Sequence, residues 1–165
     1  NLERCGVMNS VVVRNDGVGL CNRLARDGFK FDKILLDAPC SGEGTLRSSA
    51  KAFLMWNIKV VDKLSREQKK LIANAIKCLK VGGTLVYSTC THSPEENEEI
   101  VDFALKNFPV SVEKVQLPLK CRPGVTQWEG AEYSSEMTKT CRIYPQDNNS
   151  EGFFVSKIKL IEEIE

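Results

Sequence analysis

A short apolar run that ends in a carboxylate places the strongest constraint on how this chain can fold. Within Phe31–Asp37 the apolar residues are continuous rather than alternating with polar ones. That pattern is typical of a parallel strand buried on both faces. Ser10–Val13 and Thr84–Ser88 are predicted to be strands as well, because both are rich in β-branched and apolar residues. We therefore expect a sheet that contains buried parallel strands.

Helical patterns alternate with these strands. The stretch Ser65–Lys80 places its apolar residues on one face, and a capping box formed by Ser65 and Gln68 predicts its start. Gly82-Gly83 is expected to end it. Ser93-Pro94-Glu95-Glu96 is a strong signal for the start of a second helix. The residues of that helix expected in the core are Ile100, Val101, Ala104 and Leu105.

The pattern changes after Pro109. Val110–Leu117 alternates like a strand, residues 119–141 are irregular, and Gly152–Ile161 is predicted to be the last strand. Strands that alternate with helices and end in a strand pair predict an α/β fold with a doubly wound, Rossmann-like sheet. A chain of 165 residues without a linker is expected to form one domain.

Composition limits the function only slightly. The chain has 23 Lys and Arg residues against 22 Asp and Glu residues, a net charge of +1. The basic signature of many nucleic-acid-binding proteins is absent, so such a partner has to be inferred from a site. No apolar run approaches the ~20 residues that cross a bilayer, and the polar start is not a signal peptide. We therefore expect no membrane partner and a cytoplasmic location.

The seven cysteines do not follow a metal or disulfide pattern. Their number is odd and no two are separated by two residues, which disfavours both a disulfide scaffold and a zinc cluster. We expect no bound metal. Five of the cysteines are expected to be reduced thiols that pack as small apolar side chains. These five are Cys5, Cys21, Cys78, Cys121 and Cys141.

Polar and reactive side chains follow the predicted strands at their carboxyl ends. They are found at Asp16, in Asp37–Ser41 and in Ser88–Thr91. Open α/β sheets bind ligands at this edge. Two thiols and two carboxylates that converge there indicate a functional site, although an Asp before Gly, as at Asp16, is also a common turn residue.

The surroundings of Cys40 and Cys90 favour reactive thiols. Pro39 restricts the backbone and is expected to hold Cys40 on a stiff turn. Cys90 lies shortly before the helix predicted to start at Ser93-Pro94, and the positive end of a helix favours a thiolate. The simpler alternative is that both thiols only pack.

Other polar residues in this region are predicted to be structural. Glu95, Glu96, Glu98 and Glu99 are expected to form a solvated first helical turn rather than a metal site. His92 is expected to be a polar surface residue.

Two segments carry a recognisable pair of motifs. They are Asp37-Ala38-Pro39-Cys40-Ser41-Gly42-Glu43-Gly44-Thr45 and Tyr87-Ser88-Thr89-Cys90-Thr91 with Glu96-Asn97-Glu98. These motifs resemble those of the Sun (Fmu) family of RNA cytosine-C5 methyltransferases, which use S-adenosylmethionine. Arg142–Pro145 with Gly152–Phe154 is similar to the closing hairpin of that family.

The resemblance implies roles for four residues and a class of partner. Cys90 would be the nucleophile that adds to carbon 6 of cytosine, and Cys40 would assist its release. Asp37 would hydrogen-bond the base and lie near the methionine end of S-adenosylmethionine. Asp16 would accept a hydrogen bond from the adenine amino group. The substrate would be RNA, either tRNA or rRNA.

Part of the family pattern has no counterpart here. The Gly-rich cofactor loop and the ribose-binding acid are not found. Asp16-Gly17-Val18-Gly19 follows the wrong strand and opens no clear phosphate-type helix. We therefore expect residues 1–165 to be one partial catalytic domain. It would be an N-terminally truncated, Rossmann-like class I methyltransferase sheet with a terminal antiparallel hairpin. Alone it would bind S-adenosylmethionine weakly or not at all, show negligible turnover, and self-associate through an unprotected sheet edge.

Two other functions stay open. A DNA cytosine methyltransferase would attack through Cys40, although Ser88–Thr91 does not supply the acidic motif expected on its next strand. A non-catalytic RNA-binding or assembly module would fit the missing cofactor loop and the neutral charge. Enzymes that methylate amino groups are disfavoured, because they carry Pro-Pro-aromatic where this chain has Ala38-Pro39-Cys40.

Overall fold

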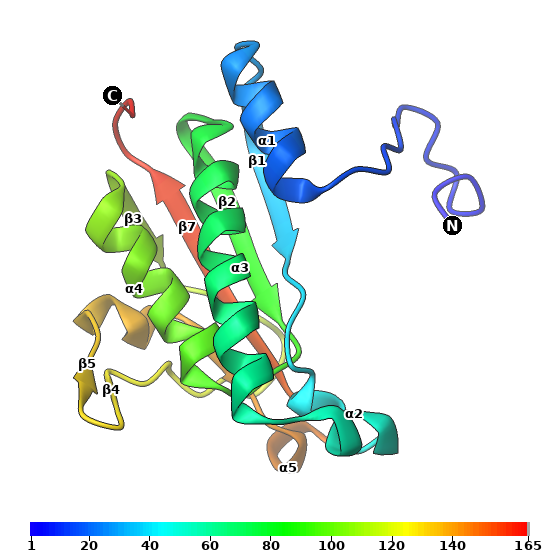
Figure 1. Ribbon diagram of the computed structural model, residues 1–165, viewed down its shortest axis with the longest axis vertical. Coiled ribbons are helices and arrows are strands. Elements are labelled where there is room, and N and C mark those ends of the chain that lie inside the picture. The colour runs from blue at the N-terminus through cyan, green and yellow to red at the C-terminus, as the bar shows by residue number, and fades with distance from the viewer. Residues whose placement is uncertain (165) are drawn as a thin grey trace.

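The computed structural model describes residues 1–164 and shows an α/β fold around one mixed sheet (Figure 1). β1 (Phe31–Asp37) and β2 (Leu79–Thr89) run parallel. β7 (Phe153–Leu160) is antiparallel to β2 and also pairs with β3 (Val110–Glu113) and β6 (Cys141–Ile143). The strand order β1-β2-β7-β3, with β6 paired to the start of β7, confirms the α/β class and the closing antiparallel pair.

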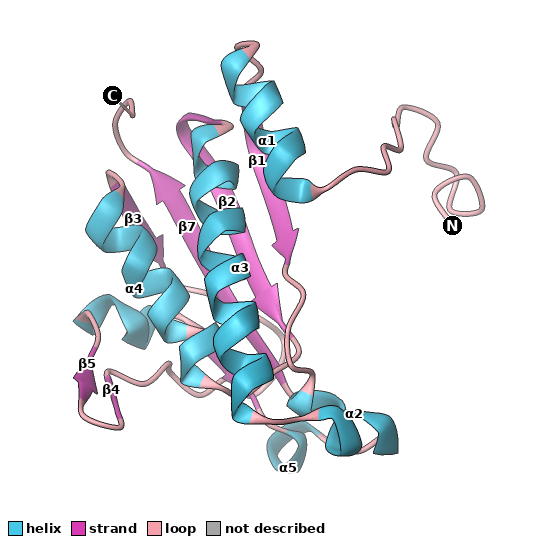
Figure 2. Cartoon of the chain, in the orientation of Figure 1, coloured by secondary structure: helices cyan, strands magenta, loops and turns pink. Residues whose placement is uncertain are grey.

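Three helices cover one face of this sheet, as Figure 2 shows. They are α1 (Gly17–Arg26), α3 (Ile58–Lys77) and α4 (Glu98–Asn107). The core lies between these helices and the sheet. Ile100, Val101 and Ala104 of α4 are fully buried there, which confirms the predicted inward face of this helix.

Shorter elements lie mostly toward the end of the sheet where β1 and β2 finish (Figure 1). They include α2 (Ala50–Met55), α5 (Pro145–Asn148) and a small hairpin of β4 (Gln127–Trp128) and β5 (Ala131–Glu132). Three 3-10 helices complete the described elements, at Glu43–Thr45, Pro94–Glu96 and Ser135–Lys139.

The free side of the sheet differs from the sequence-based expectation. β1 has the predicted bounds and parallel pairing, but its burial on both faces is wrong, since Leu35 is 72% exposed. β1 is the outermost strand of the sheet. Leu35 points to the face of the sheet that α1, α3 and α4 do not cover. Ser10–Val13 is not a strand, because it pairs with no described strand; it extends away from the sheet with Val11 and Val12 exposed (Figure 1).

The helix before β2 starts earlier than predicted. Asn57 caps α3 by accepting a hydrogen bond from the backbone N–H of Val60 at 3.1 Å. Ser65 and Gln68 consequently lie inside the helix and are buried, so the predicted capping box is wrong. Gly82-Gly83 does not end the helix either. It lies within β2, where a Cβ on Gly83 would come within 2.8 Å of a backbone oxygen.

Two other predicted bounds change because of neighbouring elements. The signal at Ser93-Pro94 begins only the 3-10 helix Pro94–Glu96, and α4 follows at Glu98. β3 ends at Glu113 rather than Leu117. The register explains this, because β6 occupies the remaining edge of β7 beyond the position that Glu113 pairs with.

Cys121 and Cys141 form a disulfide, so the expectation of reduced thiols is wrong for this pair. Arg122 and Arg142 exchange backbone hydrogen bonds of 2.9 and 2.8 Å, which align the adjacent cysteines. The two segments are thereby held together where β6 begins. Of the other cysteines expected to pack as thiols, Cys78 is buried, Cys21 is half-buried and Cys5 is exposed.

A buried ion pair joins β6 to α4. The Arg142 guanidinium, 3% exposed, donates to both carboxylate oxygens of the fully buried Glu98. Arg142 Nη1 also donates to the carbonyl oxygen of His92 at 2.8 Å, and Glu98 Oε1 accepts from the backbone N–H of Val125 at 3.0 Å. One pair therefore holds four segments of the chain together.

We expect Arg142→Met to lower the free energy of unfolding by about 3–5 kcal/mol, because the Glu98 carboxylate would stay buried without its partner. Urea titration followed by circular dichroism measures this change. Lys80→Met is the control, since Lys80 pairs with Asp32 at the surface and should leave stability nearly unchanged. A loss no larger than that of the control would contradict a supporting role for the buried pair.

Candidate active site

The adjacent tips of β1 and β2 bring the two predicted thiols together. Asp37 pairs with Ser88 in the parallel register, and Ser88 Oγ donates to Asp37 Oδ1 at 2.9 Å. Beyond this pair the two segments continue from the same end of the sheet, because the strands are parallel. Cys40 Sγ and Cys90 Sγ lie 3.1 Å apart, and the backbone N–H of Cys90 also donates to Cys40 Sγ at 3.2 Å. The structure therefore brings the two sulfur atoms into direct contact at one place.

The contact makes the two thiols chemically unequal. A hydrogen bond from Cys40 stabilises the thiolate of Cys90 and lowers the pKa of Cys90 to about 7. The same bond, together with deeper burial, raises the pKa of Cys40. The helix start after Cys90, from which we expected this effect, is one 3-10 turn, and the nearby carboxylates of Asp37 and Glu96 oppose the shift. The neighbouring thiol is therefore the main cause.

A buried amide and a buried carboxylate hold the Cys40 turn. Gln68 Nε2 donates to the carbonyl oxygen of Pro39 at 2.7 Å and to Glu96 Oε2 at 2.8 Å. Glu96 Oε2 also accepts from the backbone N–H of Ser41 at 3.0 Å. Glu96 is fully buried, and this desolvation raises its pKa. The expectation of a solvated Glu96 is therefore wrong.

The roles of Gln68 and Glu96 in holding the Cys40 turn were not predicted from the sequence. Gln68 lies four residues before the buried Ile72 and therefore on the apolar face of α3. A polar residue on such a face was the available signal for a buried hydrogen-bonding role. For Glu96 no comparable signal exists, because its burial depends on the distant turn at Ser41.

A second set of contacts holds the Cys90 segment. Thr89 Oγ1 donates to Asn97 Oδ1 at 2.6 Å, and Asn97 Nδ2 donates to the carbonyl oxygen of Thr91 at 3.0 Å. The backbone N–H of Gly44 donates to the carbonyl oxygen of Cys90 at 2.9 Å. A Cβ on Gly44 would come within 2.7 Å of that oxygen, so the close approach of the two loops requires glycine.

Both predicted carboxylates line one cavity. Its volume is about 690 Å³, and its walls include Asp16, Asp37, Pro39 and Lys70. Asp16 is the N-cap of α1 and accepts from the backbone N–H of Gly19 at 2.7 Å. An α-helix thus begins at this segment, where the sequence shows no clear signal for one of the phosphate-binding type. Asp16 combines a capping role with a place in the cavity wall.

His92 is packed rather than free at the surface. Its ring stacks on Tyr144, with centroids 4.9 Å apart and planes 13° from parallel. Its backbone N–H donates to Glu43 Oε1 at 2.9 Å. Burial, with a smaller effect of the Arg142 charge, lowers the pKa of His92, so the imidazole is held neutral.

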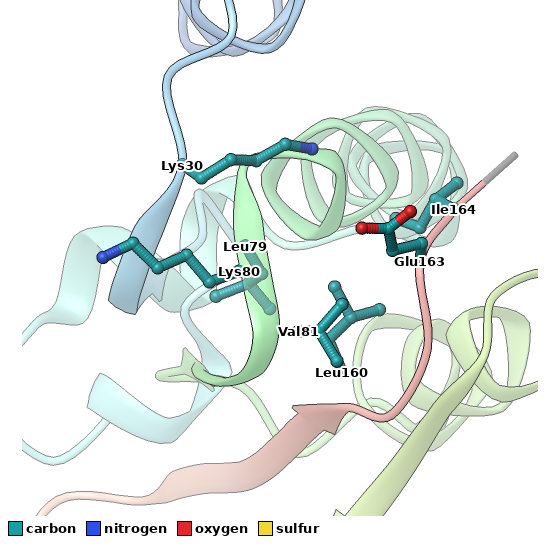
Figure 3. A pocket seen from close by; sticks show the side chains of 7 residues that line it. All are labelled: Lys30, Leu79, Lys80, Val81, Leu160, Glu163 and Ile164. Atoms are coloured by element: carbon teal, nitrogen blue, oxygen red, sulfur yellow. The ribbon is translucent and has the colours of Figure 1, made fainter.

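A different cavity, of about 420 Å³, lies at the opposite end of the sheet (Figure 3). The ammonium groups of Lys30 and Lys80 point away from each other in that view. Each is already paired, with the carbonyl oxygen of Lys77 and with Asp32 respectively. This cavity brings no reactive groups together.

Within residues 1–164, no three His, Cys, Asp or Glu side chains gather in a way that would hold a metal ion. None of the described helices is both long and apolar enough to span a bilayer.

Comparison with known sequences gives a clear relationship. Residues 1–159 match the family model described as 16S rRNA methyltransferase RsmB/F. The tRNA (cytosine(49)-C(5))-methyltransferase of Pyrococcus abyssi is 50% identical over 159 residues, which are 96% of this chain and 50% of that protein. Ribosomal RNA small subunit methyltransferase F of Photobacterium profundum is 39% identical over 159 residues, 96% of this chain and 31% of that protein.

Solved structures agree in fold. A methyltransferase homologue from Pyrococcus horikoshii has a TM-score of 0.81 and 34% identity, covering 97% of this chain and 48% of that one. NSun6 from Pyrococcus horikoshii, solved with SFG, has a TM-score of 0.74 and 32% identity, covering 98% and 37%. The chain thus spans half or less of the length of these proteins. These matches confirm the resemblance to the Sun family, and the chain belongs to the 16S rRNA methyltransferase RsmB/F family.

Proposed function

We propose that this chain carries the catalytic thiols of an RNA cytosine-C5 methyltransferase that acts on tRNA or rRNA in the cytoplasm with S-adenosylmethionine. The contact of Cys40 with Cys90, 3.1 Å apart and beside a carboxylate-lined cavity, is the observation that supports this best. The chain spans half or less of its relatives, and we propose that residues 1–165 are part of a larger catalytic domain. The activity is therefore that of the whole enzyme.

Cys90 is the proposed nucleophile. Carbon 5 of cytosine is unreactive in the aromatic ring, and a sulfur–carbon bond at carbon 6 makes carbon 5 nucleophilic. A pKa of about 7 keeps a large fraction of Cys90 as the attacking thiolate near neutral pH. Cys40 would stabilise this thiolate by donating its S–H across the 3.1 Å contact between the two sulfur atoms.

Cys40 is the proposed release residue. After methylation the proton on carbon 5 must leave before the bond between carbon 6 and Cys90 can break. Cys40 Sγ lies 3.1 Å from Cys90 Sγ, and this short distance supports a role for Cys40 on the same ring that Cys90 would attack. For this step Cys40 would first lose its own proton to solvent water. The Cys40 thiolate would then take the proton from carbon 5, the double bond between carbons 5 and 6 would form again, and Cys90 would leave as a thiolate. The raised pKa of Cys40 makes this thiolate the stronger base of the two.

The carboxylates fit the proposed cofactor and base. A cavity of about 690 Å³ lies within the usual range of ~300–1,000 Å³ for small-ligand sites. Asp16 would accept a hydrogen bond from the adenine amino group, and Asp37, held by Ser88, would hydrogen-bond the cytosine. S-adenosylmethionine, when bound, supplies the methyl group.

Covalent trapping tests these roles. In the full-length protein, we expect Cys90→Ala to abolish the covalent adduct with 5-fluorocytosine-containing RNA, because no sulfur is left to attack carbon 6. Cys40→Ala should preserve or accumulate the adduct. Denaturing gel electrophoresis measures both, with the matching DNA as a parallel substrate.

The opposite pattern, with an adduct on DNA that needs Cys40, would favour a DNA cytosine methyltransferase. If every variant fails to form an adduct while still binding RNA, the chain acts as a binding module. Cys5→Ala is the control, because Cys5 is exposed in the N-terminal segment.

The pH dependence of alkylation tests the thiol pair without RNA. We expect iodoacetamide to modify Cys90 with a midpoint near pH 7, since the thiolate is the reactive form and the pKa is about 7. Cys40→Ala removes the stabilising donor, so the midpoint should rise toward the ordinary value of ~8.5. At pH 7 the fraction of Cys90 present as thiolate should fall by about 15-fold, and the alkylation rate should fall by a smaller factor because a thiolate of higher pKa is more nucleophilic. Peptide mass spectrometry measures the rate at each cysteine, and an unchanged midpoint would contradict the donor role of Cys40.

Gln68 is expected to act as a positioning residue for Cys40. Gln68→Met removes the donor to Pro39 and Glu96 while keeping a similar volume, so adduct formation should slow and the unfolding free energy should fall by about 1–3 kcal/mol. The pH midpoint for alkylation of Cys90 should also shift. A loss of stability alone would leave this midpoint unchanged. Asn74→Leu is the matched control, because its amide bonds only within α3. Equal adduct rates in both variants would rule out the positioning role.

A further inference from the structure

Both tryptophans of the chain line one cavity that the proposed mechanism does not use. Its volume is about 390 Å³, and Trp56 and Trp128 reach it from segments far apart in sequence. Each indole is a little over 40% exposed, and the stacked rings of His92 and Tyr144 form another part of the wall. Four aromatic rings therefore surround a space large enough for a nucleobase.

The two catalytic loops also form walls of this cavity. Glu43 follows Cys40 by three residues, and His92 follows Cys90 by two. The two loops are joined here by the hydrogen bond from the backbone N–H of His92 to Glu43 Oε1. A group bound in this cavity would consequently be a close neighbour of a base bound at the thiols.

The cavity is organised before any ligand enters. Trp128 Nε1 donates to Glu95 Oε1 at 3.0 Å, and Glu95 Oε2 accepts from Ser93 Oγ at 2.9 Å. These bonds orient the Trp128 ring from the short β4–β5 hairpin. Binding would therefore lose little conformational entropy in ordering this side chain.

The charge of the walls selects a base rather than a phosphate. Glu43, Glu95 and Glu129 contribute carboxylates. Among the described residues that line the cavity, Arg142 is the only cation, and Glu98 already neutralises it. A phosphate would be repelled, whereas a flat, uncharged ring with amino donors suits aromatic faces beside carboxylates.

We propose that this cavity binds an unpaired nucleobase adjacent to the target cytosine, stacked on Trp56 and Trp128. The proposal rests on the proposed function for the identity of the RNA and its target. It adds that the enzyme recognises a flanking nucleotide in an extended or flipped-out segment, through the same loops that carry the thiols.

A mutant cycle between protein and RNA tests the proposal. The full-length protein carries Cys90→Ala to prevent turnover. It is titrated with a short single-stranded RNA that has one cytosine flanked by adenines. We expect Trp128→Leu and Trp56→Leu to weaken binding by about 5- to 150-fold, the range expected for loss of one base stack. With RNA that is abasic on either side of the cytosine, the same variants should bind about as well as the parent protein.

Phe29→Leu is the matched control, because Phe29 is an exposed aromatic residue outside the cavity and should bind both RNAs like the parent. Equal losses for the intact and abasic RNAs would overturn the proposal, as would stronger quenching of tryptophan fluorescence by an arginine-rich peptide than by RNA. Adduct formation in the Cys90-containing protein is measured separately. If the protein forms no adduct but the tryptophan variants lose affinity only for the intact RNA, the proposed function alone would be contradicted.

Discussion

Parallel pairing of β1 with β2 is the constraint on which the candidate site depends. Asp37 lies opposite Ser88, so the two strands end at the same level and their chains leave the sheet side by side. The sulfur atoms of Cys40 and Cys90 then meet at 3.1 Å. A slip of one residue in this pairing would turn the side chains of one strand to the other face. The thiol contact, and with it the lowered pKa of Cys90, would be lost.

Three consecutive buried polar residues stabilise this arrangement. Glu96 accepts from the Cys40 turn, Asn97 bonds both sides of Cys90, and Glu98 pairs with Arg142 of β6. Each would be costly to bury without its partner, because unpaired polar groups lose their hydration. The segment that follows Cys90 thus holds the Cys40 loop, the Cys90 loop and β6 in one geometry.

Prediction from sequence succeeded where a local pattern decided the structure. The continuous apolar run of β1 and the small residues after it located a strand and the loop that carries Cys40. The same reasoning failed for Ser10–Val13, where an apolar β-branched run has no strand beside it in the described chain. It also failed for Gln68, whose capping signal was outweighed by the earlier cap at Asn57 and by burial of the amide against the Cys40 turn.

The order of β1, α3, β2, α4, β3 and β7, and the places of Cys40 and Cys90 just after β1 and β2, were determined by the sequence alone. Periodicity and turn residues encode such features within a few neighbouring positions. Tertiary structure decided that one thiol donates to the other, that Cys121 pairs with Cys141, and that the two tryptophans share a cavity. These properties depend on distances between segments far apart in sequence, and no local pattern specifies such distances.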